Sequence, residues 1–233
     1  MHMNSPILKF DDVTIESSPH YETELWNVTF GLNPGELLLV RIERENERLP
    51  LADAATGLSA PKHGSVQFLG EDWQDMPADR AAALRGRVGR LFEDDGWVSD
   101  LEVDQNITLA QRHHTRRSEE EIVEEALQFA RIFGLPGLPR GRPASVRRWD
   151  LRKAACLRAF LGQPIIILEQ PVRGVYADLM APLVSSVQSA RDRGAAVLWT
   201  VTDPQIWNLP RIYATKRARM FGSQLRVMET EPL

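Results

Sequence analysis

The sequence predicts an α/β fold in which a helical segment interrupts a sheet-forming core. Short apolar runs rich in β-branched residues alternate with amphipathic stretches, which is typical of a sheet covered by helices. Between Asp94 and Ala159 the pattern is helical instead. The 233 residues are enough for one large domain or for a domain with an inserted sub-domain. We therefore expect one domain over residues 1–233, with an α/β core (1–93 and 160–233) and a helical sub-domain (94–159).

Composition excludes several classes of function. The 28 basic and 32 acidic residues give a net charge of −4, whereas a general nucleic-acid binder normally carries a basic surplus. The single cysteine, Cys156, cannot form an internal disulfide, which fits a reducing compartment. No apolar run approaches the roughly 18 residues that span a bilayer, and no signal peptide is evident. We expect a cytoplasmic protein that binds no nucleic acid and can dock on a membrane partner at its inner face.

The first part of the chain is predicted to form strands and one short helix. Alternating or continuous apolar residues predict strands over residues 7–15, 25–32, 37–40, 65–69 and 88–92, and a helix over 51–58. The turn Asn33-Pro34-Gly35 leads into the third of these strands. Gly57 is a candidate C-cap for the helix, and this structural role alone accounts for a glycine at that position.

The rest of the chain is predicted to be mostly helical before strands return. Helices are expected over residues 104–112, 118–133, 151–161 and 181–191, and strands over 165–168, 195–201, 212–215 and 224–228. Ser118 followed by Glu121 is the pattern of a capping box. The run 165–168 is continuously apolar, which indicates a strand that is covered on both faces.

Taken in order, these landmarks resemble the nucleotide-binding domain of an ATP-binding-cassette (ABC) transporter. The framework residues that match are Gly35, Thr56, Gly57, Gly64, Pro164, Pro171 and Gly174, and the similarity runs from about Ile7 to Val227. The segment from Leu91 to Arg112 is most similar to the branch that energises Mla-type bacterial phospholipid transport. The resemblance implies a P-loop NTPase-like ABC cassette: a mixed sheet core with an antiparallel β part and an inserted α-helical sub-domain.

The phosphate-binding loop of that family is degenerate in this chain. The resemblance places it at Ile42, Glu43, Arg44, Glu45, Asn46, Glu47, Arg48, Leu49 and Pro50. Such a loop needs glycines so that backbone N–H groups can surround the phosphates, a lysine, and a hydroxyl for Mg²⁺. No glycine remains, Arg48 stands at the lysine position, and Leu49 and Pro50 replace hydroxyl residues. One glutamate about 4 Å from a phosphate would cost about 4 kcal/mol at an effective dielectric near 20, so ordinary phosphate binding is not expected.

At the other motifs of the family, this chain also lacks the residues that contact nucleotide. By resemblance, Glu93 stands at the metal-sensing glutamine, Glu169 at the metal-linked aspartate, Gln170 at the catalytic glutamate and Asp203 at the switch histidine. A neutral amide such as Gln170 cannot accept a proton. The Ser-Gly-Gly signature is replaced by Val146, Arg147, Arg148, Trp149 and Asp150. We therefore expect no catalytic residue, no metal and no resident cofactor, and Mg-ATP only if non-standard residues have rebuilt the site.

Each of these features also has a purely structural interpretation. Glu169 can pair with an arginine instead of a metal ion. Arg147 and Arg148 can lie in a solvated turn instead of binding a partner. The histidine pair 113–114 predicts no metal site, because no carboxylate lies at ligand spacing. Cys156 is on the apolar face of a predicted helix and is expected to be inert core.

Three functions follow from the resemblance and its departures. The first is a pseudo-ATPase that serves as a docking or regulatory subunit of a membrane transport complex, with lipid as the candidate cargo. Its transmembrane partner would contact residues 93–101 through Glu93 and an exposed Trp97, although Trp97 can equally be core. The second is an active ATPase with non-standard residues, acting as a homodimer or with an intact ATPase subunit. The resemblance implies that each nucleotide site joins the phosphate loop of one subunit to the signature of the other. Because both segments are altered in this chain, pairing with an intact subunit restores neither site.

The third function is a cassette that binds another anion. The arginines that would hold it are Arg41, Arg44, Arg48, Arg147 and Arg148. The same side chains could instead neutralise Glu43, Glu45 and Glu47 in a cluster of salt bridges. The two interpretations differ in whether the site is open or filled by its own side chains.

Overall fold

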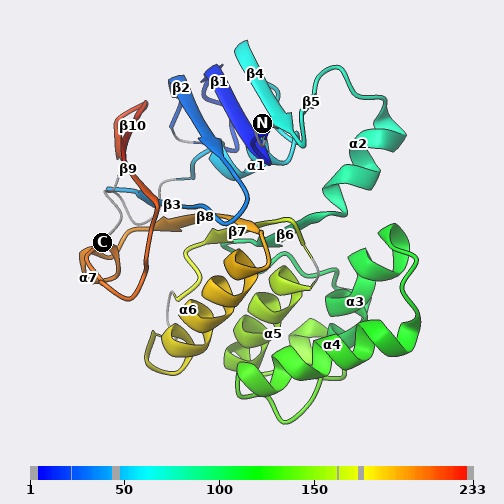
Figure 1. Cartoon of the computed structure of the whole chain (residues 1–233). Helices are drawn as coiled ribbons and strands as arrows, with labels where there is room; N and C mark the ends of the chain where they lie inside the picture. Colours follow the sequence, from blue (N-terminus) through cyan, green and yellow to red (C-terminus); the bar gives the residue numbers. More distant parts are fainter. Residues whose placement is uncertain (1–4, 22, 44–47, 162, 173–175, 230–233) are drawn as a thin grey trace.

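The computed structural model describes residues 5–21, 23–43, 48–161, 163–172 and 176–229 (Figure 1). Gly174 and four residues of the predicted phosphate loop (Arg44, Glu45, Asn46 and Glu47) lie outside this part of the chain. Two sheets and a layer of helices make up the fold, with the larger sheet in the middle. None of the described helices is long and apolar enough to cross a membrane.

The central sheet has six strands and is mixed. Its order is β10 (Gln224–Glu229), β9 (Lys216–Phe221), β3 (Leu37–Arg41), β8 (Ala196–Val201), β7 (Ile165–Glu169) and β6 (Val88–Leu91). All neighbouring strands are parallel except β10, which is antiparallel to β9. The loops after β3, β6 and β7 therefore leave the sheet at the same edge, where ligands of open α/β sheets usually bind.

A smaller antiparallel sheet covers one face of the central sheet. It contains β2 (Leu25–Leu32), β1 (Leu8–Ile15), β4 (His63–Phe68) and β5 (Glu71–Asp72), in that order. One buried core lies between the two sheets, and within it the rings of Phe10 and Phe30 stack with their centroids 4.5 Å apart. The short helix α1 (Leu51–Ala55) contributes its apolar residues to the same core.

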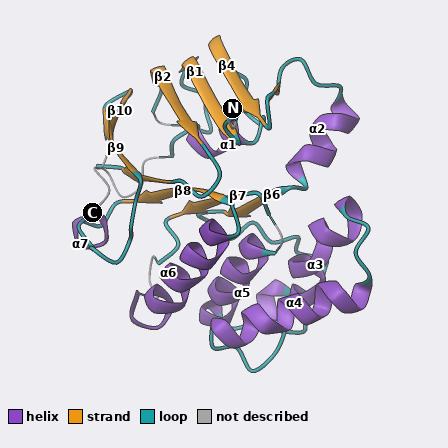
Figure 2. Ribbon diagram, in the orientation of Figure 1, coloured by secondary structure: helices purple, strands orange, loops and turns teal. Residues whose placement is uncertain are grey.

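Helices cover the opposite face of the central sheet (Figure 2). They are α3 (Val103–His114), α4 (Glu119–Ile132), α5 (Arg148–Phe160) and α6 (Tyr176–Asp192), with the 3-10 turn η1 (Pro143–Ser145) before α5. Ile165 and Ile167 of β7 face the smaller sheet, while Ile166 and Leu168 face the helices. The expectation of a strand covered on both faces is confirmed. The capping box at α4 is also present, because the Ser118 hydroxyl accepts a bond from the backbone N–H of Glu121.

Several elements differ from the prediction. The prediction of a strand over residues 212–215 is wrong, and the strand in this part of the chain is β9. It was missed because arginine and lysine side chains stand between and before its buried residues, Ala218 and Met220. The helix α2 (Ala78–Arg85) was not predicted, because only Ala81 and Leu84 of its residues are buried. The short helix α7 (Pro204–Trp207) was also missed. Helix α6 begins at Tyr176, five residues before its predicted start at 181.

Candidate functional site

The described residues of the predicted phosphate loop lie between β3 and α1. Ile42 is buried, and Pro50 precedes α1 without a side-chain capping bond. The exposed Arg48 donates from Nη2 to Asp94 Oδ2 at 2.7 Å. Just before the loop, at the end of β3, Arg41 Nε lies 3.9 Å from Glu43 Oε1, which is too far for a hydrogen bond, and this buried nitrogen has no hydrogen-bond partner among the described residues. Of the predicted arginine–glutamate pairs, the described residues show the Arg41–Glu43 contact, whereas Arg48 pairs with Asp94 instead of with a glutamate of the loop.

A buried ion cluster lies beside this loop and joins three elements. Arg90 of β6 donates from Nε to Glu169 Oε1 at 2.7 Å and from Nη1 to Asp53 Oδ1 at 2.5 Å. The Arg90 side chain is 9% exposed, against 18% for Glu169 and 25% for Asp53. Tyr21 donates its hydroxyl to the other oxygen of Asp53. The structure thus brings Glu169 together with an arginine, as the structural interpretation of that residue predicted.

The titration behaviour of the cluster follows from burial and charge. Burial raises the pKa of Glu169, and the attraction of Arg90 only partly offsets it. Burial would lower the pKa of Arg90, but its two carboxylate partners outweigh that effect and raise it. The pKa of Tyr21 is raised by burial and then by its bond to Asp53, so this phenol remains a donor. Arg90 therefore stays charged and is shared between two acids.

The other positions that the resemblance singled out make local contacts within the chain. Gln170 follows β7 with a φ of 48°, and its side-chain oxygen accepts from the N–H and the hydroxyl of Thr202, each at 3.2 Å. Asp203 caps α7 by accepting from the backbone N–H of Gln205 at 2.7 Å. The backbone oxygen of Glu93 accepts from Arg152 at 3.4 Å. All three residues follow strands at the sheet edge where ligands of such folds bind. The side chains of Gln170 and Asp203 are hydrogen-bonded to neighbouring residues of the same chain.

Two cavities lie at this edge among the described residues. The smaller, about 20 Å³, is lined in part by Glu93, Glu169 and Gln170 and has room for little more than a water molecule. The larger, about 440 Å³, is lined by His20, Tyr21, Arg48, Leu49, Asp53, Arg90, Phe92, Glu93, Asp94, Gly96 and Glu169. Its four carboxylates exceed its two guanidinium groups, so its lining favours cations over a polyphosphate. Within the described ranges, no three His, Cys, Asp or Glu side chains are grouped to hold a metal ion.

The residues at the signature position lie at the start of α5. Arg147 precedes the helix without a capping bond, and Arg148, Trp149 and Asp150 form its first turn. Trp149 is 56% exposed, and both arginines are exposed. Val146 is half-buried and packs against the helix-side core. Neither arginine lines the cavity at the sheet edge, so the described residues do not assemble the five-arginine anion site.

Two arginines of α5 hold the loop that follows β6, and the sequence did not single them out. Arg152, 6% exposed, donates to the backbone oxygens of Phe92 (3.1 Å) and Gln170 (2.5 Å) and to the Asp95 carboxylate (2.5 Å). Arg158 donates to the backbone oxygens of Asp95 and Gly96. The available signal was the presence of long cationic side chains on helix faces that must pack against the sheet. Asp53 and Arg90 were also missed, because they lie far apart in the chain and meet Glu169 only in the folded structure.

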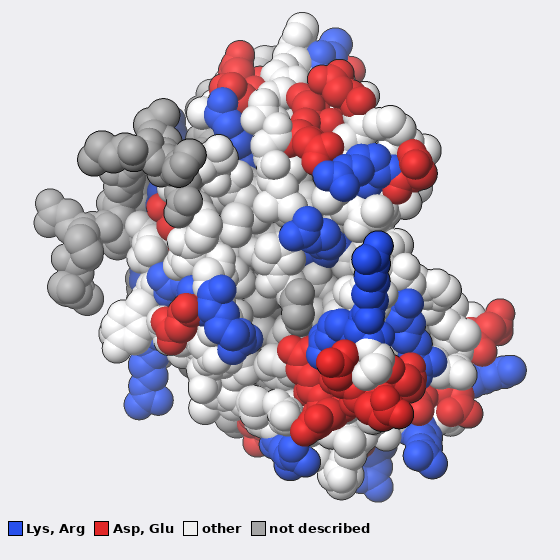
Figure 3. All heavy atoms as spheres, turned by 45° about the vertical axis from the view of Figure 1, so that its right-hand side comes forward, with Lys and Arg blue, Asp and Glu red and all other residues white. Residues whose placement is uncertain are grey.

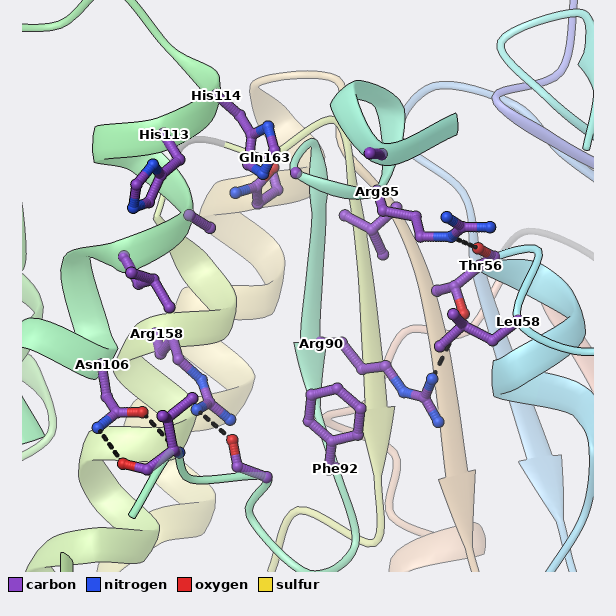
Figure 4. A pocket seen from close by; sticks show the side chains of 17 residues that line it. Thr56, Leu58, Arg85, Arg90, Phe92, Asn106, His113, His114, Arg158 and Gln163 are labelled. Atoms are coloured by element: carbon purple, nitrogen blue, oxygen red, sulfur yellow. Dashed lines mark hydrogen bonds between the residues drawn. The ribbon is translucent and has the colours of Figure 1, made fainter. Parts of the chain in front are cut away.

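The expectation of an exposed Trp97 is wrong. Its side chain is half-buried and packs against the helix-side core. The guanidinium carbon of Arg158 lies 4.6 Å from the centre of its ring. In the loop that follows β6, Gly96 and Val98, the two neighbours of Trp97, line a groove of about 740 Å³ between α2, β6 and α3. Figure 4 shows the groove with Arg85 on one side and His113, His114 and Arg158 on the other.

Comparison with known proteins gives relatives in sequence and in structure. No protein-family model matches the chain. A probable anion import ATP-binding protein of Haloferax volcanii is 27% identical over 78% of this chain and 67% of its own length. The intermembrane phospholipid transport system ATP-binding protein MlaF of Escherichia coli is 27% identical over 58% of this chain, a match that spans about half of MlaF. A dimeric ATP-binding cassette with ADP and phosphate bound superposes with a TM-score of 0.83 at 18% identity, covering 97% of this chain and all of the other.

These comparisons confirm the resemblance to the ABC nucleotide-binding domain. The chain has the P-loop NTPase-type fold of an ABC cassette, with the mixed sheet and the helices in the arrangement that the resemblance implied. Its relatives in sequence are ATP-binding proteins of import and transport systems.

Proposed function

We propose that this chain is a pseudo-ATPase: a cassette that has lost nucleotide chemistry and serves as a docking or regulatory subunit of a membrane transport complex. The single observation that carries the proposal is the ion cluster of Arg90, Asp53 and Glu169. A guanidinium group already neutralises the carboxylate at the metal-linked position. Binding of Mg²⁺ there would have to displace a buried cation from two acids, and a nucleotide would then meet the carboxylates of the neighbouring cavity.

Pairing with another cassette does not rescue the activity. In this family each composite site joins the phosphate loop of one subunit to the signature of the other. In this chain no glycine remains in the first segment, and Arg147, Arg148 and Trp149 fill the second. A homodimer therefore lacks both parts at each site, and a mixed dimer with an intact cassette lacks one part at each. We infer that such a complex obtains its energy from sites that do not include this chain.

The partner we propose is a transmembrane subunit, which would hold the chain at the inner face of the membrane. The groove between α2, β6 and α3 is the surface offered to it, because it is large and lined by apolar side chains such as Leu58 and Val98. Phospholipid is the cargo we assign to the complex. That assignment rests on the likeness of residues 91–112 to the Mla-type branch and on the match to MlaF.

Calorimetric titration with Mg-ATP tests the proposal, with the unfolding temperature followed at millimolar nucleotide. E. coli MlaF serves as the positive control. We expect no heat and an unchanged melting curve. A ligand at 100 times its Kd adds about 2.7 kcal/mol of stability, which would raise the Tm of a chain this size by roughly 5–11 °C. A shift of that size would replace the pseudo-ATPase by an ATP-binding subunit that uses non-standard residues.

A further inference from the structure

Three arginines lie side by side across the outer strands of the central sheet. Arg219 of β9 is the register partner of Arg41 on β3 and of Arg226 on β10. Register partners point to the same face of a sheet, and neighbouring strands lie about 4.8 Å apart. Because Ala218 packs toward the smaller sheet, Arg219 and its two partners point to the opposite face. Figure 1 shows β9 and β10 beside α7, at the end of the sheet farthest from β6.

A fourth arginine and an indole ring belong to the same cluster. Arg217 lies two residues before Arg219 on β9 and therefore points to the same face. The guanidinium carbons of Arg217 and Arg219 lie 5.1 Å and 5.3 Å from the centre of the Trp207 ring, so both cations lie against one side chain of α7. The guanidinium carbon of Arg226 lies 5.1 Å from the centre of the Phe221 ring. We refer to Arg41, Arg217, Arg219 and Arg226 as the arginine cluster.

The charges of the arginine cluster are poorly neutralised. Within the described part of the chain, the only carboxylate paired with it is that of Glu43, whose Oε1 lies 3.9 Å from Arg41 Nε. The Nε atoms of Arg41 and Arg219 are buried and have no hydrogen-bond partner among the described residues. Arg217 donates to the backbone oxygen of Trp207, which leaves its charge without a counter-ion. Like charges directly opposite each other on neighbouring strands are destabilising, and an anion placed among the four groups would relieve that repulsion.

The arginine cluster is separate from the site built around Arg90. None of its four members lines either cavity beside Glu169, and β8 and β7 lie between β3 and β6 in the sheet. The acidic side chains that gather in Figure 3 lie over the helical layer, to which the exposed Glu119 and Glu120 of α4 belong. In a chain whose net charge is −4, the cluster is therefore a local concentration of positive charge.

We propose that the arginine cluster binds a phosphate group, which is carried either by a soluble phosphate ester or by the headgroup of an anionic phospholipid. A phosphate monoester has about two negative charges and three terminal oxygens, so it can serve several guanidinium groups at once. The planar guanidinium group donates two parallel hydrogen bonds to phosphate oxygens, which a lysine cannot do. The proposal does not depend on the loss of ATPase activity, because it concerns a different part of the sheet.

Calorimetric titration of the full chain with inorganic phosphate tests the soluble source, with the Tm followed in parallel. Phosphate at about ten times its Kd should raise the Tm by roughly 3–6 °C, while sodium chloride at the same ionic strength should give a smaller shift. Arg219→Gln should weaken binding about tenfold, because it removes the central cation of the cluster. Arg87→Gln is the matched control: it removes an exposed charge before β6, at the opposite edge of the sheet, and should leave the affinity unchanged.

A second variant keeps the test independent of folding. Arg226 is exposed on the outermost strand, so Arg226→Gln removes a cation of the cluster without disturbing the core, and it should also weaken binding. Flotation with phosphatidylcholine vesicles that contain phosphatidic acid tests the headgroup source. Binding to these vesicles but not to inorganic phosphate assigns the cluster to a lipid headgroup, and binding to inorganic phosphate alone assigns it to a soluble ester.

Three results would overturn the proposal. They are the absence of binding to both probes, equal stabilisation by sodium chloride, and binding that Arg219→Gln and Arg226→Gln leave unchanged. Mg-ATP also carries phosphate, so the separate titration with it is repeated on Arg219→Gln. Heat that is lost in this variant comes from the arginine cluster and supports the proposal. Heat that persists comes from the site around Arg90 and would remove the pseudo-ATPase function alone.

Discussion

Replacing Arg90 by methionine should destabilise the protein substantially. Methionine keeps most of the length of the side chain but removes the cation, so Asp53 and Glu169 would remain partly buried without their partner. Breaking a buried ion pair costs about 3–5 kcal/mol. Because the two carboxylates are 25% and 18% exposed, water can solvate them in part, and we expect about 3 kcal/mol. For a chain of 233 residues this corresponds to a Tm lower by roughly 6–12 °C.

Urea unfolding followed by tryptophan fluorescence measures this change. The Arg90→Met variant should show a lower midpoint at an unchanged m value. Arg48→Met is the matched control, because its bridge to Asp94 is exposed on both sides and should contribute about 0–1 kcal/mol. Equal losses for the two variants, or a loss below about 1 kcal/mol for Arg90→Met, would refute the role assigned to the cluster.

The cost of Arg90→Met should also depend on pH. The folded-state pKa of Glu169 is already raised by burial, and removal of Arg90 would raise it further. The folded variant then binds more protons than the unfolded chain above the ordinary pKa of glutamate, so its stability falls as the pH rises through that window. The difference from the wild-type protein should therefore narrow when the pH is lowered from 7 toward 5. A difference that stays constant or widens would contradict this sign.

Two further predictions concern packing and reactivity. Gly89→Ala should lower the free energy of unfolding by several kcal/mol, because its Cβ would lie 1.9 Å from the backbone oxygen of Ala159. Gly137→Ala, with open space around it, should change little. Near-equal melting curves for both variants would contradict the close contact. Cys156 should not react with a thiol reagent in the native state at pH 8, because burial raises its pKa to about 12; rapid labelling without denaturant would show that the site opens.

The fold was predictable where the local pattern and the tertiary environment agree. The strand at residues 25–32 has the predicted bounds, and the capping box at Ser118 places the start of α4. Prediction failed where burial was slight or charge obscured the period. Helix α2 buries only two residues, and β9 carries charged side chains between its buried positions. Such elements are held by their neighbours, which a local pattern does not reveal.

For the candidate site, the sequence predicted the positions of single residues but not their contacts. The positions of Glu93, Glu169 and Gln170 followed from the resemblance, because their place in the chain is fixed relative to β6 and β7. The pairing of Arg90 with Asp53 and Glu169 did not, since these residues are 37 and 79 positions apart and meet only after the sheet has formed. The groove charges were missed for the same reason. Their common surface is made by α2, β6, α3 and α5 together.

The hydrogen bonds of Arg152 restrict motion of the helical layer (α3 to α6) relative to the central sheet. This one side chain donates to acceptors that follow β6 and β7, and its own helix packs with α3 and α4. Rotation of the helical lobe against the sheet would break several charge-assisted bonds at once, each about 1.5–3 kcal/mol. We therefore expect the helical layer and the central sheet to move together as a rigid body rather than to open and close about a hinge. In the docking role proposed above, such rigidity would hold the complex in a fixed geometry while other subunits cycle around it.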